Sequence, residues 1–262
     1  MSSLSVSLQD LGGSIARAPL AAWLAMDDVH GRYRRTVLGP LWITIGQAAM
    51  VAGFAIVFSG LFGADPQTYL IYLAVGFPVW TLLSQFLSDM PTAFISAKGV
   101  IESYELPWLM HIWRRAFGYV LTFLHHLLIL FVVMVALNIA PSAQMLLAVP
   151  ALAIVLIAGV GVGMLVAVVG ARYRDLQPAM GVSAGFLMLM SPVVWRADQL
   201  PINQWIVQLN PFYYYLEILR APLLQQDVAP EIWLGTSIGA VALFCIGFAA
   251  FVIGRRRLYH WL

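Results

Sequence analysis

The sequence is poor in charge and nearly free of cysteine. Asp, Glu, Lys and Arg make up 10% of the 262 residues, whereas 61% are hydrophobic. Soluble domains carry about a quarter charged residues, so this composition excludes a soluble domain and indicates an integral membrane protein. Cys245 is the single cysteine, which excludes an intramolecular disulfide and a Cys-x-x-Cys metal site. Because Cys245 lies in an apolar run, we expect a buried thiol.

Catalytic and energy-coupling motifs are also absent. No acidic residue lies near the middle of an apolar run, so no mid-membrane carboxylate is present to carry protons or sodium. No Gly-x-x-x-x-Gly-Lys phosphate loop occurs, so the energy for uphill movement must come from a separate chain. Neither a catalytic residue nor a metal site is predicted.

Three glycine motifs lie within apolar runs. Two Gly-x-Ser-x-Gly matches surround Ser183 and Ser237, but a nucleophile elbow needs a strand–turn–helix setting. Gly159 and Gly163 form a Gly-x-x-x-Gly pair. We expect the glycines of all three motifs to allow close helix packing.

Uncharged windows predict the organisation of the chain. They cover 36–64, 66–88, 116–171, 177–195 and 232–254. About 20 apolar residues cross a bilayer as a helix, and the longest window breaks near Asn138 and Pro141 into a helical hairpin. Since a lipid-exposed backbone must satisfy its own hydrogen bonds, the sequence predicts an all-α integral membrane protein with six transmembrane helices.

The basic residues predict the orientation. With a cytoplasmic N-terminus and six crossings, all 14 Lys and Arg residues except Arg196 and Arg220 lie on the inner side. An excess of basic residues is typical of cytoplasmic loops, so both termini are predicted to be cytoplasmic. The chain then divides into a cytoplasmic segment 1–35, a six-span domain 36–254 and a basic cytoplasmic tail 255–262.

The N-terminal segment has an amphipathic pattern. Leu20, Trp23 and Leu24 recur with helical spacing and are followed by two aspartates. This pattern is typical of a helix that lies on the inner membrane surface. We therefore expect an amphipathic interface helix near residues 14–30.

Two segments on the inner side differ from ordinary loops. Residues 96–107 mix apolar and acidic side chains and stop at Pro107, as a short exposed helix does. Residues 171–176 form a tight turn rich in arginine. Both are predicted to be exposed on the cytoplasmic face.

The outer segment 196–231 is too apolar and aromatic for a solvated loop. Asn210 and Pro211 form a good helix start, because Asn caps a helix and Pro suits its first position. Glu217 and Arg220 are spaced to pair on that helix. We expect one or two short re-entrant helices there, which dip into the outer leaflet.

Three arginines stand at the threshold of the first span. One explanation is that these residues fix the orientation of the span, since basic residues at a cytoplasmic helix end contact anionic lipid headgroups. They are Arg32, Arg34 and Arg35. The other explanation is that they bind a phosphorylated substrate together with Tyr33, because arginine makes bidentate contacts with phosphate. The sequence leaves both open.

Together these pieces resemble the permease subunit of type-2 ABC transporters that export cell-envelope polysaccharides, and the O-antigen branch most closely. The resemblance runs from about Asp27 to Arg257. It rests on RYRRTVLGPLW at 32–42, GFPVW at 76–80, IESYELP at 101–107, ARYRD at 171–175 and LNPFY at 209–213.

The resemblance implies a homodimer in the bacterial inner membrane with two ATPase subunits on its cytoplasmic face. It implies an undecaprenyl-diphosphate-linked glycan that moves through a canal at the dimer centre. ATP and Mg would bind the ATPase, so no cofactor is expected in this chain; membrane lipids are partners and nucleic acid is not.

Other functions remain open at this stage. Capsule or teichoic acid export, and drug or lipid export by the same fold, are alternatives within the resemblance. A membrane-bound glycolipid enzyme belongs to a different class and needs paired carboxylates or a metal cluster. The adjacent pair Asp27 and Asp28 has no nearby partners for such chemistry.

The resemblance also assigns roles to individual residues. The substrate-diphosphate set is Arg32, Tyr33, Arg34 and Arg35. The ATPase-coupling set is Lys98, Glu102, Tyr104, Glu105, Arg172, Tyr173, Arg174 and Asp175. The outer-gate set is Phe212, Tyr213, Tyr214, Tyr215, Glu217 and Arg220. Flat rings stack on sugar C–H faces, and the glycan-canal set is Trp42, Phe54, Phe58, Phe62, Tyr69, Tyr72, Trp80 and Trp195. The alternative for these rings is an interfacial belt that faces lipid.

Overall fold

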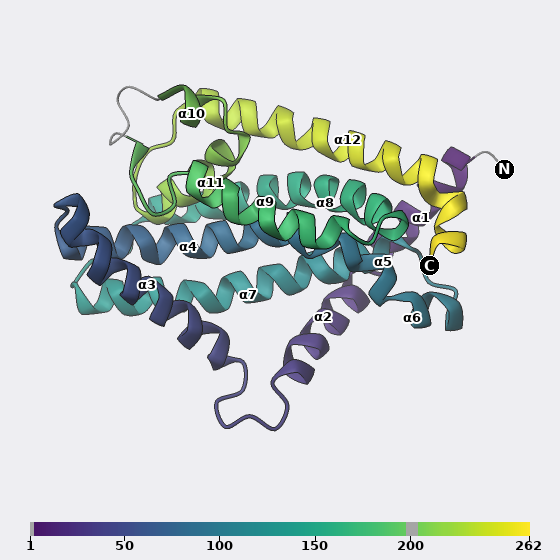
Figure 1. The fold of residues 1–262 in the computed structure, drawn as a ribbon, viewed down its shortest axis with the longest axis horizontal. Coiled ribbons are helices and arrows are strands. Elements are labelled where there is room, and N and C mark those ends of the chain that lie inside the picture. Colours follow the sequence, from purple (N-terminus) through teal and green to yellow (C-terminus); the bar gives the residue numbers. More distant parts are fainter. Residues whose placement is uncertain (1–2, 198–203) are drawn as a thin grey trace.

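The computed structural model describes residues 3–197 and 204–262, and these residues form helices without any strand. The all-α prediction is therefore confirmed for the described residues. Residues 198–203 of the predicted re-entrant segment lie outside them. The helices form an elongated bundle (Figure 1). They are α1 (Ser3–Ala16), α2 (Ala18–Arg32), α3 (Leu41–Phe62), α4 (Pro66–Ser88), η1 (Met90–Thr92), α5 (Ala93–Ser96), α6 (Lys98–Ser103), α7 (Leu109–Ala136), η2 (Ala143–Leu147), α8 (Ala148–Arg172), α9 (Leu176–Met190), α10 (Gln204–Gln208), α11 (Pro211–Leu223) and α12 (Pro230–Trp261).

Five helical stretches of the described chain are long and apolar enough to cross a membrane: Leu41–Phe62, Pro66–Ser103, Leu109–Ala136, Ala143–Arg172 and Pro230–Trp261. The predicted fifth span corresponds to α9, which is apolar but only 15 residues long. At about 1.5 Å per residue, α9 is shorter than the roughly 30 Å of a hydrocarbon core. The structure thus contains five of the six predicted spans at full length.

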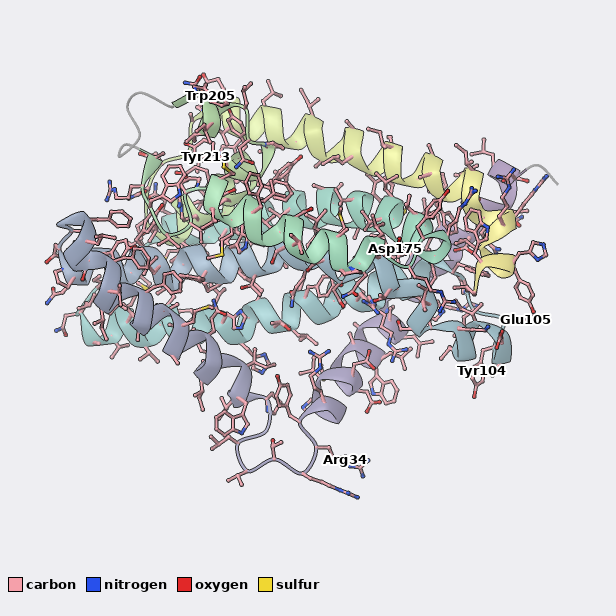
Figure 2. The ribbon with its side chains drawn as sticks, in the orientation of Figure 1. Arg34, Tyr104, Glu105, Asp175, Trp205 and Tyr213 are labelled. Atoms are coloured by element: carbon pink, nitrogen blue, oxygen red, sulfur yellow. The ribbon has the colours of Figure 1, made fainter. Side chains whose placement is uncertain are left out.

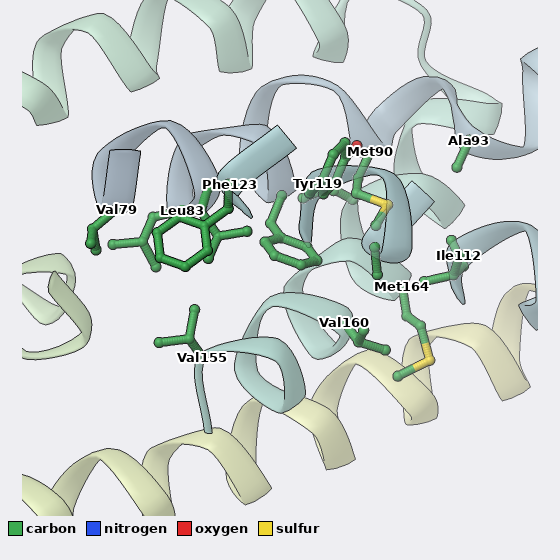
Figure 3. Close-up of a cluster of buried hydrophobic side chains, with 14 of the residues drawn as sticks. Val79, Leu83, Met90, Ala93, Ile112, Tyr119, Phe123, Val155, Val160 and Met164 are labelled. Atoms are coloured by element: carbon green, nitrogen blue, oxygen red, sulfur yellow. The ribbon is translucent and has the colours of Figure 1, made fainter. Parts of the chain in front are cut away.

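The core lies where α4, α7 and α8 meet (Figure 3). Val79 and Leu83 of α4, Phe123 of α7 and Val155 of α8 are all buried in one cluster. Tyr119 packs edge-on against the ring of Phe86, with 5.1 Å between the ring centres. In the most apolar part of each stretch, 61% of the residues are buried in Pro66–Ser103, which contains α4, but only 11% in Leu41–Phe62, which is α3. Most of the apolar surface of α3 therefore faces outward.

Glycines bring α8 into backbone contact with its neighbours. A Cβ atom on Gly161 would lie 2.5 Å from the backbone of Leu243 in α12, and one on Gly247 would lie 1.9 Å from the Gly161 carbonyl oxygen. Gly159 and Gly163 lie against the side chains of Phe86 and Met90, where a Cβ atom would come within 2.6 and 3.1 Å. The expected close packing at the Gly-x-x-x-Gly pair is confirmed.

The same expectation is mostly wrong for the Gly-x-Ser-x-Gly motifs within this protomer. Gly181, Gly185 and Gly235 face open space, and only Gly239 makes a close approach, to the Tyr215 hydroxyl at 2.7 Å. The burial expected for Cys245 is also wrong, since its side chain is exposed on α12. An apolar run marks lipid-facing and buried positions alike, so hydrophobicity did not separate them.

The N-terminal segment contains two helices where one was predicted. In α2, the small residues Ala21 and Ala25 are fully buried, while Leu20 and Trp23 remain exposed. α1 is tied to the end of the chain, because the Ser3 hydroxyl donates to the Val252 carbonyl at 2.8 Å. Both termini therefore lie at the same end of the bundle (Figure 1).

Candidate functional site

The four residues of the predicted diphosphate set occupy the end of α2 and the loop that follows it. Arg32 is the last residue of α2 and lines a cavity between α2 and α7. Tyr33 ends the helix, and its carbonyl accepts hydrogen bonds from the amide and hydroxyl of Thr36 at 3.1 and 2.8 Å. Arg34 and Arg35 lie exposed in the loop that projects between α2 and α3 (Figure 2).

Left-handed backbone conformations shape this loop. Gly39 has φ +56° and Arg35 has φ +69°, a region that a residue with a Cβ atom rarely adopts. Pro40 then caps α3, whose first residues are Leu41 and Trp42. The chain thus turns at Arg35 and again at Gly39 before it enters α3.

The predicted exposed helix on the inner side corresponds to α6, which buries none of its residues. Lys98 pairs with Glu102 across one turn at 3.8 Å and donates to the Leu262 carbonyl at 2.6 Å. Tyr104 is 65% exposed, and Glu105 is exposed beside it. These two residues lie at the end of the bundle where both termini lie (Figure 2).

The turn after α8 forms a second exposed surface. Arg172, Tyr173, Arg174 and Asp175 are all exposed. The Arg172 guanidinium lies over the rings of Tyr173 and Trp261, at 5.0 and 5.6 Å from their centres. The C-terminus thereby packs against this turn, which the sequence did not indicate.

The three phenylalanines of the glycan-canal set lie on one face of α3, and this face packs against α4. Phe54 stacks on Phe58 with 5.2 Å between ring centres, and Phe58 lies 5.7 Å from Phe62. Phe54 also contacts Phe77 of α4 edge-on at 5.0 Å. Phe62 continues to Tyr69 at 6.2 Å. The rings form one ladder in the seam between α3 and α4, and Phe62 lies at its exposed end.

The other members of the glycan-canal set differ in exposure. Tyr69 and Trp80 are only 3% and 5% exposed, so both lie inside the protomer. The Tyr69 hydroxyl donates to the Val194 carbonyl at 2.6 Å. Trp195 is half-buried and donates to the Leu189 carbonyl at 3.0 Å. Trp42 is 48% exposed and reaches the surface.

The outer segment contains the helix that its sequence predicted. Asn210 accepts a hydrogen bond from the Phe212 amide at 2.9 Å, and Pro211 follows as the first residue of α11. The side-chain amide of Asn210 also donates to the Ser191 hydroxyl at 2.8 Å. Trp80 of α4 packs against Phe212, with 5.9 Å between ring centres. The start of α11 is thus held to two neighbouring segments.

A buried ionic network holds the other end of α11. The predicted ion pair between Glu217 and Arg220 is confirmed. The Arg220 guanidinium also donates to the Tyr72 hydroxyl at 2.6 Å and to the Pro192 carbonyl at 2.5 Å. The sequence predicted the pair but not the contacts of Arg220 with Tyr72 and Pro192, which lie far away in the chain.

The three tyrosines of the outer-gate set are half-buried. The hydroxyl of Tyr214 donates to the Gln208 carbonyl at 2.8 Å, and that of Tyr215 to the Thr236 carbonyl at 3.2 Å. Tyr213 stacks edge-on with Tyr214, and its ring centre lies 5.1 Å away. Figure 2 shows Tyr213 at the end of the bundle opposite Glu105.

The structural role of Asp10 was not predicted from the sequence. Asp10 of α1 accepts hydrogen bonds from the backbone amides of Trp108 and Leu109 at 3.0 and 2.9 Å. It therefore caps the N-terminus of α7, and Arg255 of α12 lies 3.4 Å from the same carboxylate. Nothing in the local sequence of α1 signals a cap for a helix that begins 99 residues later.

Within residues 3–197 and 204–262, no group of three or more His, Cys, Asp or Glu side chains is placed to hold a metal ion. The polar clusters of the described chain are ion pairs and hydrogen bonds between helices. The comparisons with known proteins agree with this picture of a helical membrane protein. The model of the ABC-2 type transporter family matches residues 21–224.

The chain belongs to the ABC-2 type transporter family. The match extends from α2 to the last turn of α11 and so covers most of the helical bundle. As an ABC-2 permease, the chain is a membrane subunit of a transporter and not a catalytic enzyme. The family predicted from RYRRTVLGPLW and the other motifs is confirmed.

A named ABC-2 relative adds detail. The O-antigen export system permease protein RfbA of Klebsiella pneumoniae is 20% identical over 186 residues, which cover 70% of this chain and 72% of that protein. The likeness of this ABC-2 permease to an O-antigen export permease agrees with the branch that the motifs indicated.

Proposed function

We propose that this ABC-2 permease belongs to an ATP-driven exporter of undecaprenyl-diphosphate-linked polysaccharide of the O-antigen kind. The observation that carries the proposal is the likeness to an O-antigen export permease over 70% of the chain. The substrate moves across the bacterial inner membrane, and a separate ATPase binds ATP and Mg. This chain itself holds no cofactor.

Six crossings fit the positions of the termini. A chain whose two ends lie on one side of a membrane crosses it an even number of times, and both termini lie at one end of the bundle (Figure 1). With five full-length spans, α9 and the apolar residues 191–195 supply the sixth. Residues 1–35 and 255–262 are then cytoplasmic, as the distribution of arginines favours, and α10 and α11 lie within the outer leaflet.

A homodimer fits the outward faces of α3 and α9. Gly46, Gly53 and Gly60 recur every seven residues along α3, and a Cβ atom on any of them would meet nothing within 4 Å. Gly181 and Gly185 lie four residues apart on α9, and a Cβ atom on either would also meet nothing within 4 Å. Small residues at such spacing favour close helix contact in a membrane, so we assign these faces to the second copy of the chain.

The canal between the two copies is lined by the exposed rings of the glycan-canal set. Trp42 and Phe62 reach the surface of the protomer, whereas Tyr69, Tyr72 and Trp80 are buried. We therefore keep Trp42 and Phe62 as canal residues and treat the buried rings as their support. Phe54, Phe58 and Trp195 are half-buried and belong to the wall behind them.

The exposed inner surfaces suit ATPase contact. α6 presents Glu102 with Tyr104 and Glu105 beyond it, and the turn at 172–175 presents a second patch of mixed charge. Both are exposed, so docking an ATPase there would disturb no part of the protomer's core.

Arg34 and Arg35, in the loop before α3, are the residues that we assign to the substrate diphosphate.

A deletion strain tests the export proposal. Cells that lack this chain should lose surface polysaccharide and accumulate undecaprenyl-linked glycan on the inner leaflet, and the plasmid-borne chain should restore the surface product. Normal surface polysaccharide together with a gain in drug sensitivity would instead favour the drug exporter alternative. Immunoblots of surface glycan and mass spectrometry of extracted lipids measure the two outcomes.

A further inference from the structure

A polar cavity lies between α2 and α7 and is closed by the end of α4 and by α5 and α6. Its volume is about 680 Å³. None of the residues assigned to the canal or the outer gate contributes to its wall. Its polar and charged wall includes Asp28, Arg32, Gln85, Asp89, His111 and Arg115.

Both acidic residues of this cavity are already neutralised. Asp28 forms a two-point ion pair with Arg114, in which the Arg114 Nε donates at 2.7 Å. Asp89 pairs with Arg115 at 2.8 Å and accepts from the Tyr119 hydroxyl at 2.7 Å. Three arginines against two aspartates leave a formal excess of one positive charge.

The remaining charge belongs to Arg32. Its side chain is exposed at the end of α2, and it has no hydrogen-bond or ion-pair partner among residues 3–197 and 204–262. A guanidinium without a carboxylate attracts an anion, and its planar fork suits the oxygens of a phosphate.

Two buried side chains of the cavity also lack partners. His111 is 2% exposed, and neither of its ring nitrogens makes a hydrogen bond within the described chain. The side-chain oxygen of Gln85 is likewise buried without a partner. Buried polar groups are nearly always hydrogen-bonded, so these atoms point to a ligand that offers both acceptors and donors.

The position of the cavity narrows the class of ligand. Trp23 on the outward side of α2 is 62% exposed, and tryptophan favours the level of lipid headgroups. At that level a phosphate and hydroxyl groups occur together in the headgroup of phosphatidylglycerol. Such a headgroup supplies phosphate oxygens to Arg32 and His111 and a hydroxyl donor to Gln85.

We propose that this cavity binds the phosphate of a hydroxyl-bearing membrane lipid, with free inorganic phosphate as the other source of the same chemistry. The ligand is distinct from the exported glycan, so the inference goes beyond the proposed function. Occupancy would bridge α2 to α7 and to the segment that leads into α6.

Gly118 allows a test that leaves the charged residues intact. It lines the cavity from α7, and a Cβ atom there would meet nothing within 4 Å. A leucine at this position would place its side chain at the wall of the cavity and narrow it. Gly12 of α1 is the matched control, since it is also helical and a Cβ atom there meets nothing within 4 Å.

The experiment uses the purified full-length chain in detergent and native mass spectrometry. Phosphatidylglycerol, phosphatidylcholine and inorganic phosphate are the probes. We expect the wild type and Gly12→Leu to hold one phosphatidylglycerol per chain in preference to phosphatidylcholine, and Gly118→Leu to bind it at least tenfold more weakly. His111→Phe should weaken binding while the helical circular dichroism signal stays unchanged, because the histidine has no partner to lose.

The outcomes show whether the cavity binds phosphate and whether that phosphate belongs to a lipid or is free. Competition by millimolar inorganic phosphate that Gly118→Leu abolishes would support the site and assign it to free phosphate. Absence of phosphatidylglycerol and phosphate binding to the wild type, or equal binding to folded Gly118→Leu, would overturn it. No ATPase or glycan is present in the assay, so a failure of the export proposal leaves the result intact.

Discussion

The Arg220 guanidinium donates a hydrogen bond of 2.6 Å to the Tyr72 hydroxyl and lies 4.7 Å from the centre of the same ring. These residues are 148 positions apart in the chain. The contact joins α11 to α4, and Pro192 joins the segment after α9 to both. A charged side chain that is 5% exposed therefore joins three segments at this end of the bundle.

Removing Arg220 should destabilise the outer end strongly. Arg220→Met leaves Glu217, whose side chain is only 20% exposed, without its partner. Breaking a buried ion pair in this way costs about 3–5 kcal/mol. Tyr72→Phe keeps the ring and removes only the hydroxyl, so we expect a loss of about 1–2 kcal/mol. Thermal unfolding in detergent measures both, with Tyr104→Phe as the control, because Tyr104 is 65% exposed; an unchanged melting temperature in Arg220→Met would contradict the anchoring role.

The long-range cap by Asp10 makes a second prediction. Asp10→Ala removes the acceptor of two α7 amides and the partner of Arg255, and a buried charged hydrogen bond of this kind contributes about 1.5–3 kcal/mol. Asp27→Ala is the control, because Asp27 is exposed on α2. Limited proteolysis should release the N-terminal helix from the Asp10→Ala variant first. Equal protection in both variants would show that α1 docks by other contacts.

The glycine contact between α8 and α12 makes a third prediction. Gly247→Ala places a Cβ atom 1.9 Å from the Gly161 carbonyl oxygen, so the two helices must separate. Overpacking of a tight contact costs about 1–3 kcal/mol, and more where the backbone itself must move. Gly181→Ala, where a Cβ atom meets nothing within 4 Å, should be neutral in the monomer. Equal melting temperatures for the two variants would show that the close contact between α8 and α12 does not contribute to stability.

Charge reversal on α6 tests energy coupling. The double variant Glu102→Lys with Glu105→Lys should insert and fold normally, because both side chains are exposed. Pull-down of the ATPase and export of glycan should fall together, since the docking surface loses its charge complement. Glu231→Lys, exposed at the start of α12, is the control. If the double variant transports at the wild-type rate, α6 has no coupling role.

Lysine substitution tests the diphosphate role of the arginines. The triple variant Arg32→Lys, Arg34→Lys and Arg35→Lys keeps every charge and should insert with normal topology. Export should drop about tenfold or more, since lysine lacks the bidentate fork that fits a phosphate. Because the structure separates Arg32 from the loop, Arg34→Lys with Arg35→Lys should account for most of the drop. Full export by the triple variant would leave topology as the only role of these residues.

Local signals in the sequence predicted much of the fold. The cap at Asn210 with Pro211 and the pair of Glu217 and Arg220 each depend on residues within a few positions of one another. Such features follow from helical geometry, because side chains three or four apart share one face. The family was also recognisable from short motifs, and the match to residues 21–224 agrees.

Tertiary structure alone decided which way each helix faces. The sequence placed Phe54 and Phe58 in the canal set, but they pack towards α4, and it predicted a buried Cys245, which is exposed. Lipid tails are as apolar as a protein core, so hydrophobic patterning cannot assign the rotation of a helix. The contacts of Asp10 with Leu109 and of Tyr72 with Arg220 depend on those rotations. They join residues 99 and 148 positions apart, and only the packed bundle brings them together.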